Sequence, residues 1–118
     1  MNLRSIFQNY KQVEEFPAGT TVFAEGSTGN VMYVVLDGEV EVRVRDELVG
    51  VLGPGEIVGE MALVDAKPRS ATIVARSDCR LASVDERRFL FMVSETPFFA
   101  IHVMRVMAER LRKRMKVE

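Results

Sequence analysis

The chain has 118 residues, 47% of them hydrophobic and 28% charged, with a formal net charge of −1. This length suits one domain with a substantial core, and the near-neutral charge gives no general attraction to nucleic acid or an anionic membrane. No apolar stretch approaches the roughly 18–20 residues that span a bilayer, and residues 1–16 contain no apolar core of a secretory signal. Cys79 is the single cysteine, which excludes an internal disulfide and a four-cysteine metal site. We therefore expect a cytoplasmic protein without a membrane segment.

The larger, N-terminal part of the chain predicts a short helix followed by strands. Residues 2–10 suit an amphipathic helix, because their apolar side chains follow the i, i+3, i+4, i+7 spacing. Between about 16 and 84, short β-type runs alternate with turn signals. Asp37-Gly38 suits a two-residue type I′ hairpin loop, and 39–45 alternates valines with charged residues as a half-buried strand does. Short strands with tight turns favour a sandwich or barrel over βαβ units.

The C-terminal part of the chain predicts two helices. Asp85 is a suitable N-cap for a helix over about 86–95, whose apolar residues form one helical face. Thr96-Pro97 then restarts a helix over about 97–115, since proline is tolerated at the first helical position. We expect a single domain over 1–118, in the order helix, β-roll, two helices.

The stretch 59–72, GEMALVDAKPRSAT, places two charges in a half-buried setting. Glu60 and Arg69 stand in a run rich in glycine and apolar residues. A lone buried charge costs several kcal/mol, so each of the two needs a partner. Either they pair with each other, or a polar group from outside the segment meets them.

The residue types in this stretch favour a sugar phosphate as the outside group. Gly59 allows close backbone approach, and a single helical turn starting at Gly59 or Glu60 would present free N–H groups to an anion. Arg69 adds a planar fork that fits phosphate oxygens, and Ser70 adds a hydroxyl donor. Glu60 would repel phosphate but can accept a hydrogen bond from a sugar hydroxyl. This reasoning predicts ribose on Glu60 and phosphate on Arg69.

The stretch resembles the phosphate-binding cassette of the cyclic nucleotide-binding domain family, whose pattern is G-E-(L/M)-A-L, a short gap, then (P)-R-(S/A/T)-A-T. The matching positions are Gly59, Glu60, Met61, Ala62, Leu63, Pro68, Arg69, Ser70, Ala71 and Thr72. The resemblance continues upstream through 17–42 and downstream over the two closing helices, so it covers nearly the whole chain. It implies a mainly β fold: a double-stranded β-helix, or jelly-roll-like β-roll, with one short N-terminal helix and two C-terminal helices.

The resemblance also implies a ligand and a role for each site residue. The ligand would be a cyclic nucleotide, with cAMP preferred over cGMP. Glu60 would hold the ribose 2′-hydroxyl, and Arg69 would pair with the cyclic phosphate. The phosphate cradle would be completed by the Ser70 hydroxyl and by main-chain N–H groups around Met61, Ala62 and Ala71, with Gly59 as a further ligand-binding residue that lets the backbone approach. No nucleophile–base pair lies nearby, so we expect a sensor or regulatory module that is not an enzyme and has no metal or other cofactor.

Two positions bear on the base of the nucleotide. Family members often cap the base with a residue of the last helix, and Arg114 occupies one of the aligned positions here. Arg114 could stack on a purine, although a solvated charge at a helix end is the commoner role of such a residue. In relatives, threonine at the position of Ser70 goes with cGMP and alanine with cAMP, so serine leaves the choice open.

The last helix also carries a heptad seam. Its residues are Ile101, Met104, Ala108, Leu111 and Met115. The seam predicts a parallel homodimer through this helix, and packing of the seam on the β-roll is the other interpretation. The basic run 110–116, RLRKRMK, is interpreted as solvated cations that complement the negative end of the helix dipole.

The output of the domain is not visible in the sequence. The winged-helix DNA-binding domain of bacterial transcription-factor relatives is not expected, because the chain ends where that domain would start, and the effector protein is unknown. The alternative function is a dimeric interaction module of the same fold, whose pocket is empty or holds an unrelated anion.

Overall fold

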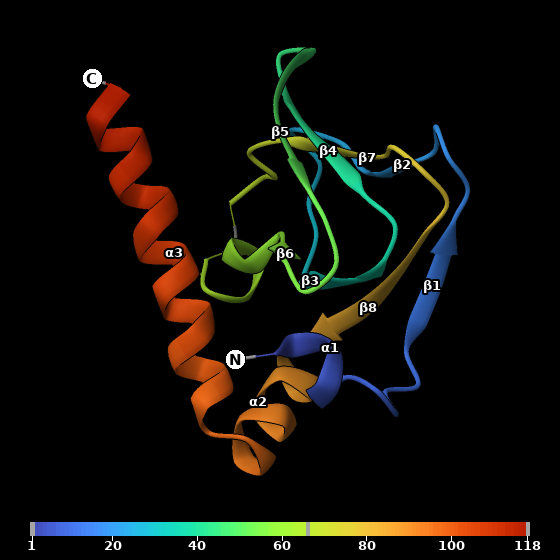
Figure 1. Ribbon diagram of the computed structural model, residues 1–118. Helices are drawn as coiled ribbons and strands as arrows, with labels where there is room; N and C mark the ends of the chain where they lie inside the picture. The colour runs from blue at the N-terminus through green and yellow to red at the C-terminus, as the bar shows by residue number, and fades with distance from the viewer. Residues whose placement is uncertain (1, 66, 118) are drawn as a thin grey trace.

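The computed structural model describes residues 2–65 and 67–117, with side chains up to residue 113 (Figure 1). The strands in this range are β1 (Val13–Phe16), β2 (Thr21–Phe23), β3 (Val31–Asp37), β4 (Val40–Val44), β5 (Glu47–Leu52), β6 (Ile57–Val58), β7 (Thr72–Ala75) and β8 (Cys79–Asp85). The helices are α1 (Leu3–Ile6), the 3₁₀-helix η1 (Glu60–Leu63), α2 (Glu86–Glu95) and α3 (Phe98–Val117). The predicted mainly β fold, with a short N-terminal helix and two C-terminal helices, is confirmed.

The strands form two antiparallel four-stranded sheets that pack face to face. The strand orders are β1-β8-β3-β6 and β2-β7-β4-β5. Most consecutive strands lie in different sheets, so the chain crosses repeatedly from one sheet to the other, as in a β-roll. The long pair β3 and β8 forms the centre of the first sheet, with Val35 opposite Leu81. Within the described residues no helix has the length and apolarity needed to span a bilayer.

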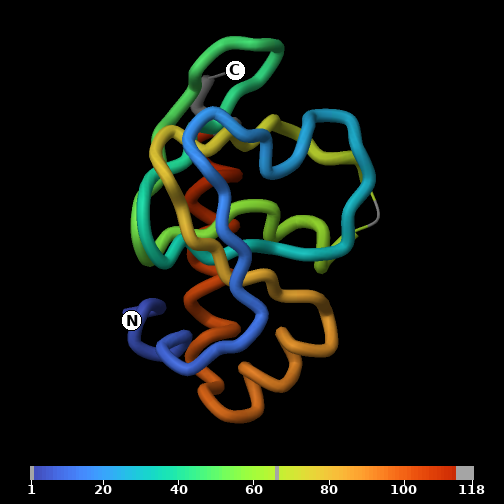
Figure 2. The backbone as a smooth tube through the Cα atoms, turned by 90° about the vertical axis from the view of Figure 1, so that its right-hand side faces the viewer, coloured from blue at the N-terminus to red at the C-terminus, as the bar shows by residue number. Residues whose placement is uncertain are grey.

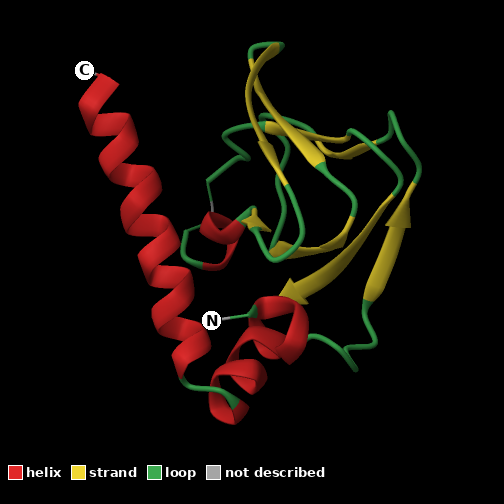
Figure 3. Cartoon of the chain, viewed as in Figure 1, coloured by secondary structure: helices red, strands yellow, loops and turns green. Residues whose placement is uncertain are grey.

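The first sheet is buried on both faces. Side chains of a strand point alternately to opposite faces, so β3 contributes to two cores. Met32 and Val34 pack under the helices, whereas Tyr33 and Val35 pack between the two sheets. Figure 3 shows the helices gathered on one side of the strands. This layering explains why 31–36 is an uninterrupted apolar run.

One predicted turn is wrong. Asp37-Gly38 is not a type I′ hairpin loop, because only Gly38 of the two has a positive φ, at +83°, and the flanking strands β3 and β4 lie in different sheets. The turn with φ > 0 at both central residues is Arg45-Asp46, at +52° and +68°, between β4 and β5. The tight pairing of these two strands imposes that geometry on residues that seldom adopt it.

The N-terminal helix is shorter than the predicted 2–10. After Ile6 the chain leaves the helix and runs toward β8, where the Tyr10 hydroxyl donates to Ser83 O at 2.6 Å. Burial raises the pKa of Tyr10 to about 12, so this hydroxyl remains a donor at neutral pH. The contact with the sheet outweighs the continuation of a helix that is too short to be stable alone.

Phe99 connects the helices to the β-roll. Its ring centroid lies 5.7 Å from that of Phe7, which follows α1, and 5.3 Å from that of Phe89 in α2, and its side chain is fully buried. Figure 2 shows α3 rising from this corner behind the strands along the height of the molecule. The start of α3 is therefore fixed in the core, whereas Leu111 near its other end is 60% exposed.

We expect Phe99→Ala to lower the free energy of unfolding by about 3–5 kcal/mol, because it empties a fully buried aromatic site. Urea denaturation followed by circular dichroism measures this change. The neighbouring Phe98 is 65% exposed, so Phe98→Ala should change the stability by no more than about 0.5 kcal/mol. Equal losses in the two variants would contradict this account of the corner.

Candidate functional site

Residues 59–65 and 67–71 lie between β6 and β7, and they begin with the short helix η1. Gly59 has φ +73°, a conformation that glycine adopts at little cost, and it directly precedes η1. The predicted helical turn is present as a single turn of 3₁₀-helix, in which the Ala62 N–H donates to Gly59 O at 3.1 Å. We refer to 59–72 as the cassette.

Arg69 lies toward the other end of the cassette, and the loop between β2 and β3 holds its main chain. The Arg69 N–H donates to Ser27 O, and the Arg69 carbonyl accepts from the Gly26 N–H, both at 2.8 Å. Only 9% of the residue is exposed. The backbone thus directs the guanidinium into the protein and away from solvent.

The Arg69 guanidinium is buried without an anionic partner. Its Nη2 donates to Val31 O at 2.8 Å and its Nη1 to Gly59 O at 3.3 Å, while its Nε has no acceptor. No carboxylate of the described residues lies within ion-pair distance of it. Burial lowers the pKa of Arg69, and the charges of Tyr33 and Glu60 oppose that shift. Because a guanidinium stays protonated in proteins, Arg69 remains a buried cation with unused donors.

Glu60 is also buried, and its partner comes from α3. It is 5% exposed, and its Oε1 accepts from Arg110 Nη1 at 2.5 Å. Arg110 Nη2 also donates to Ile57 O of β6 at 2.7 Å. Glu60 therefore does not pair with Arg69, which was one of the two arrangements expected for the cassette charges.

Arg110 is the site residue that the sequence analysis missed. It belongs to the basic run 110–116, and its interpretation as a solvated cation is wrong, because its guanidinium bonds a buried carboxylate and a main-chain carbonyl. The partner Glu60 stands 50 positions earlier in the chain. Arg110 stands at the start of a basic run that ends a helix, where arginines are commonly solvated. No signal in the neighbouring sequence could therefore have identified it as a site residue.

The other predicted site residues differ in exposure. Ser70 and Met61 are exposed, whereas Gly59, Ala62 and Ala71 are partly buried. The Ala62 N–H, one of the predicted cradle donors, is bonded to Gly59 O. The side chain of Arg114 lies outside the described residues. The roles assigned to these residues remain predictions.

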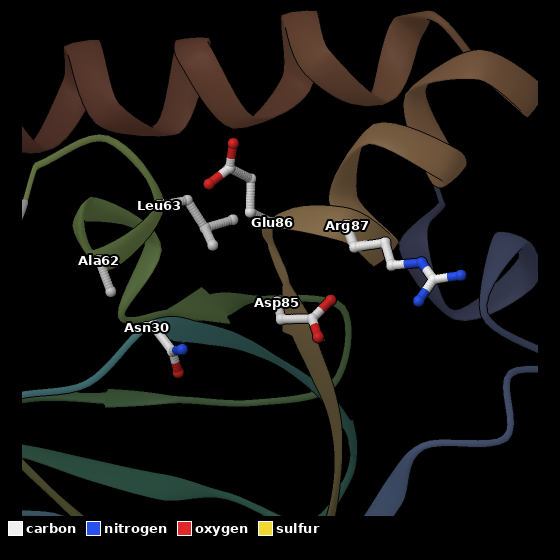
Figure 4. Close-up of a pocket in the computed structure, with 6 residues that line it drawn as sticks. All are labelled: Asn30, Ala62, Leu63, Asp85, Glu86 and Arg87. Atoms are coloured by element: carbon white, nitrogen blue, oxygen red, sulfur yellow. The ribbon is translucent and has the colours of Figure 1, made fainter.

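A cavity of about 240 Å³ lies beside the cassette, between η1 and the start of α2 (Figure 4). Its lining residues are Asn30, Ala62, Leu63, Asp85, Glu86 and Arg87. Neither Glu60 nor Arg69 lines it, and its two carboxylates would repel a phosphate. The cavity is lined by η1 of the cassette and by the start of α2, and it does not contain the two cassette charges. Among the described residues, no group of three or more His, Cys, Asp or Glu side chains is placed to hold a metal ion.

Comparison with known proteins supports the family resemblance that the cassette carries. Residues 13–96 match the family model described as the cyclic nucleotide-binding domain. The chain is 31% identical over 107 residues to the CRP-like cAMP-activated global transcriptional regulator of Mycobacterium tuberculosis, with 86% of this chain and 48% of that protein covered. The chain thus spans about half the length of this curated relative.

Solved structures show the same fold. The catabolite activator protein of Thermus thermophilus aligns with a TM-score of 0.78 at 29% identity, over 92% of this chain and 58% of that one. A structure described as "A cyclic-GMP-dependent signalling pathway regulates bacterial phytopathogenesis" aligns with a TM-score of 0.79 at 29% identity, over 92% of this chain and 90% of that one. Together with the family match, these similarities confirm the resemblance carried by the cassette.

Proposed function

The chain belongs to the cyclic nucleotide-binding domain family, and we propose that it binds cAMP at the cassette and reports it by repositioning α2 and α3. Domains of this family are regulatory and typically not catalytic, and we assign no reaction to this one. The observation that carries the proposal is the buried Arg69 guanidinium, which has no anionic partner among the described residues and an Nε–H without an acceptor.

Arg69 can bind a phosphate without giving up its present contacts. A guanidinium has five N–H donors, and two of them donate to Gly59 O and Val31 O. Three N–H donors remain, namely the buried Nε–H and one N–H on each Nη, and a phosphate that reaches the guanidinium would accept from neighbouring members of this set. A cyclic phosphodiester carries one negative charge, which would neutralise the buried cation.

Glu60 is suited to the ribose. An ionised carboxylate only accepts hydrogen bonds, and within the described chain Arg110 alone donates to Glu60, at Oε1. Its Oε2 can therefore accept from a 2′-hydroxyl while Oε1 keeps its ion pair. The charge of Arg110 also offsets the repulsion that an unpaired Glu60 would exert on a phosphate nearby.

The choice of cAMP is supported by the Mycobacterium tuberculosis relative, which is named as cAMP-activated. The solved structure with a TM-score of 0.79 is described with a cyclic-GMP-dependent pathway, so cGMP is the alternative ligand. Ser70, the position that distinguishes the two in relatives, is exposed and carries a small hydroxyl that suits either base. Titration of both nucleotides decides between them.

We expect isothermal titration calorimetry to show micromolar or tighter binding of cAMP, about −8 kcal/mol or better, and much weaker binding of AMP, whose phosphate is not cyclic. Arg69→Ala should weaken binding at least about thirtyfold, because it removes a buried charge-assisted contact. Arg76 is exposed and directly follows β7, so Arg76→Ala is the matched control with unchanged affinity. An Arg69→Ala protein that binds as the parent does would show that the cassette assignment is wrong.

The proposed repositioning of the helices rests on Arg110. One guanidinium bonds Glu60 of η1 and Ile57 O of β6, so a ligand that engages Glu60 acts on the helix that carries Arg110. The cavity between η1 and α2 gives these elements room to approach each other. Linkage is reciprocal: a ligand that shifts α3 has an affinity that depends on the position of α3. The effector that senses this shift is unidentified.

Electron paramagnetic resonance distances between labels at Glu47 on β5 and Arg112 on α3, both exposed, test this coupling. We expect saturating cAMP to change the distance distribution in the parent protein. Arg110→Ala should still bind cAMP through Arg69 but should lose the change, whereas Arg105→Ala, an exposed control on the same helix, should retain it. An unchanged distance in the cAMP-saturated parent would rule out the repositioning.

The helix α3 has two apolar faces. Val103 is 2% exposed and lies in the core, whereas the seam positions Ile101, Met104 and Leu111 are 38%, 53% and 60% exposed. The exposure of these three side chains favours pairing over packing of the seam on the β-roll; Ala108 is partly buried, and the side chain of Met115 lies outside the described residues. We propose that the seam pairs with that of a second copy in a parallel homodimer.

Met104→Glu should convert this dimer to a monomer in sedimentation equilibrium, because two like charges would face each other across the seam. Glu109 is exposed and lies outside both the seam and the e and g positions that flank it, so Glu109→Lys, which also reverses a charge, should leave the dimer intact. A parent protein that sediments as a monomer would exclude the proposed pairing.

A second function is favoured by the ion pair between Arg110 and Glu60. This pair neutralises Glu60 in the absence of a ligand. Such neutralisation is what a dimeric interaction module would require, whether its pocket is empty or an unrelated anion binds Arg69. Native mass spectrometry separates the two: a co-purifying cyclic nucleotide supports the sensor, and a ligand-free protein that also binds no nucleotide in calorimetry supports the module.

The free, buried Cys79 agrees with a reducing cytoplasm, where we place the protein.

A further inference from the structure

We propose that Phe23 is a positioning residue for Arg69. Its ring holds the guanidinium in one place, so that the N–H donors without a protein acceptor are oriented toward a bound phosphate. The inference rests on the proposed function, because it takes Arg69 as the ligand's partner. The guanidinium carbon lies 4.0 Å from the centroid of the Phe23 ring. This is well inside the roughly 6 Å over which the face of an aromatic ring attracts a cation.

A β-bulge directs the Phe23 ring into the site. On β2, Thr21 pairs with Val74 and Phe23 with Ile73, so the register shifts by one residue between Thr21 and Phe23. An extra residue of this kind bends the strand and redirects the side chains beside it. The Phe23 ring then stacks on Tyr33 of β3, with the centroids 6.1 Å apart and the planes at 24°. Because Tyr33 is itself buried, the stack gives the Phe23 ring a fixed backing.

Two glycines, Gly29 and Gly59, also restrict the position of the Arg69 guanidinium. A Cβ on Gly29 would lie 2.6 Å from Nη2 of Arg69, and a Cβ on Gly59 would lie 2.6 Å from its Nη1. These separations are too short for real atoms, so any other residue at either position would displace the guanidinium. The backbone of Gly29 is outside the positive-φ region, so space, and not conformation, requires glycine there. The ring covers one face of the guanidinium, Gly29 lies close to its Nη2, Nε and central carbon, and Gly59 lies close to its Nη1, so these three residues together restrict its orientation.

A ring stabilises this cation in a way that suits ligand binding. A carboxylate in the same place would pair with Arg69, and a phosphate would have to displace it. The face of Phe23 attracts the charge without neutralising it, and it uses none of the N–H donors in a conventional hydrogen bond. Fixing the guanidinium in advance also reduces the entropy lost when a long side chain is ordered on binding. Phe23 therefore raises the affinity without touching the ligand.

Calorimetry with cAMP on the full chain tests the proposal. We expect Phe23→Leu to raise the Kd about tenfold, because the cation loses its ring face, and Phe23→Tyr to keep the parent affinity, because the face is retained. Gly29→Ala should raise the Kd at least as much as Phe23→Leu. Gly50→Ala is the control with unchanged Kd, since its Cβ would meet nothing within 4 Å.

The chemical shift of the Arg69 Nε–H proton in the ligand-free protein is a second measurement. This shift would not depend on Phe23 if the residue served only to pack the core. The ring current of Phe23 should shift the Arg69 Nε–H proton upfield; Phe23→Leu should remove that shift and Phe23→Tyr should keep it. If the parent binds neither cAMP nor cGMP, the proposed function fails, and this resonance still decides whether Phe23 seats Arg69.

Two results would overturn the inference while leaving the proposed function in place. In the first, Phe23→Leu binds cAMP as the parent does, although Arg69→Ala does not. In the second, Phe23→Leu and Phe23→Tyr weaken binding equally and in step with a loss of thermal stability, which would assign Phe23 to packing alone.

Discussion

The buried, unneutralised charge of Arg69 is the constraint on which the site depends. Taking a guanidinium out of water costs several kcal/mol unless dipoles or charges of the protein replace the water. The fold replaces it with the carbonyls of Gly59 and Val31 and with the face of Phe23, and no carboxylate of the described chain pairs with it. The site therefore retains a positive potential, which a monoanionic diester can satisfy with its single charge.

The two charges of the cassette have different partners, and this division gives the cassette two roles. Arg69 is held by the β-roll alone, whereas Glu60 is held by α3 through Arg110. A ligand that bridges Arg69 and Glu60 would therefore connect the roll to the helix. If Glu60 had paired with Arg69, both charges would be satisfied inside the cassette, and Arg110 would have no carboxylate there to join.

Sequence reasoning succeeded where a feature depends on residues close together in the chain. The apolar run 31–36 is a strand, and Asp85 accepts from the Arg88 N–H as an N-cap. It failed where pairing between distant segments decides. The residue types of Asp37-Gly38 indicate a turn but not which strands it joins, and the direction of Phe23 depends on a bulge against β7. Arg110 could not be found at all, because only the packing of α3 on the roll brings it to its carboxylate.

The helix α3 joins the ligand site to the surface proposed for dimerisation. On one helix, Val103 is buried in the core, Arg110 bonds the cassette, and Leu111 is exposed on the seam. A continuous helix moves as one body over these few turns, so a displacement at Arg110 also moves Leu111. If α3 both responds to the ligand and pairs with a second copy, as proposed, ligand binding and pairing would act on the same element, and each would shift the equilibrium of the other. In the proposed mechanism the sheets hold Arg69 in place, and the position of α3 would differ between the free and the ligand-bound protein.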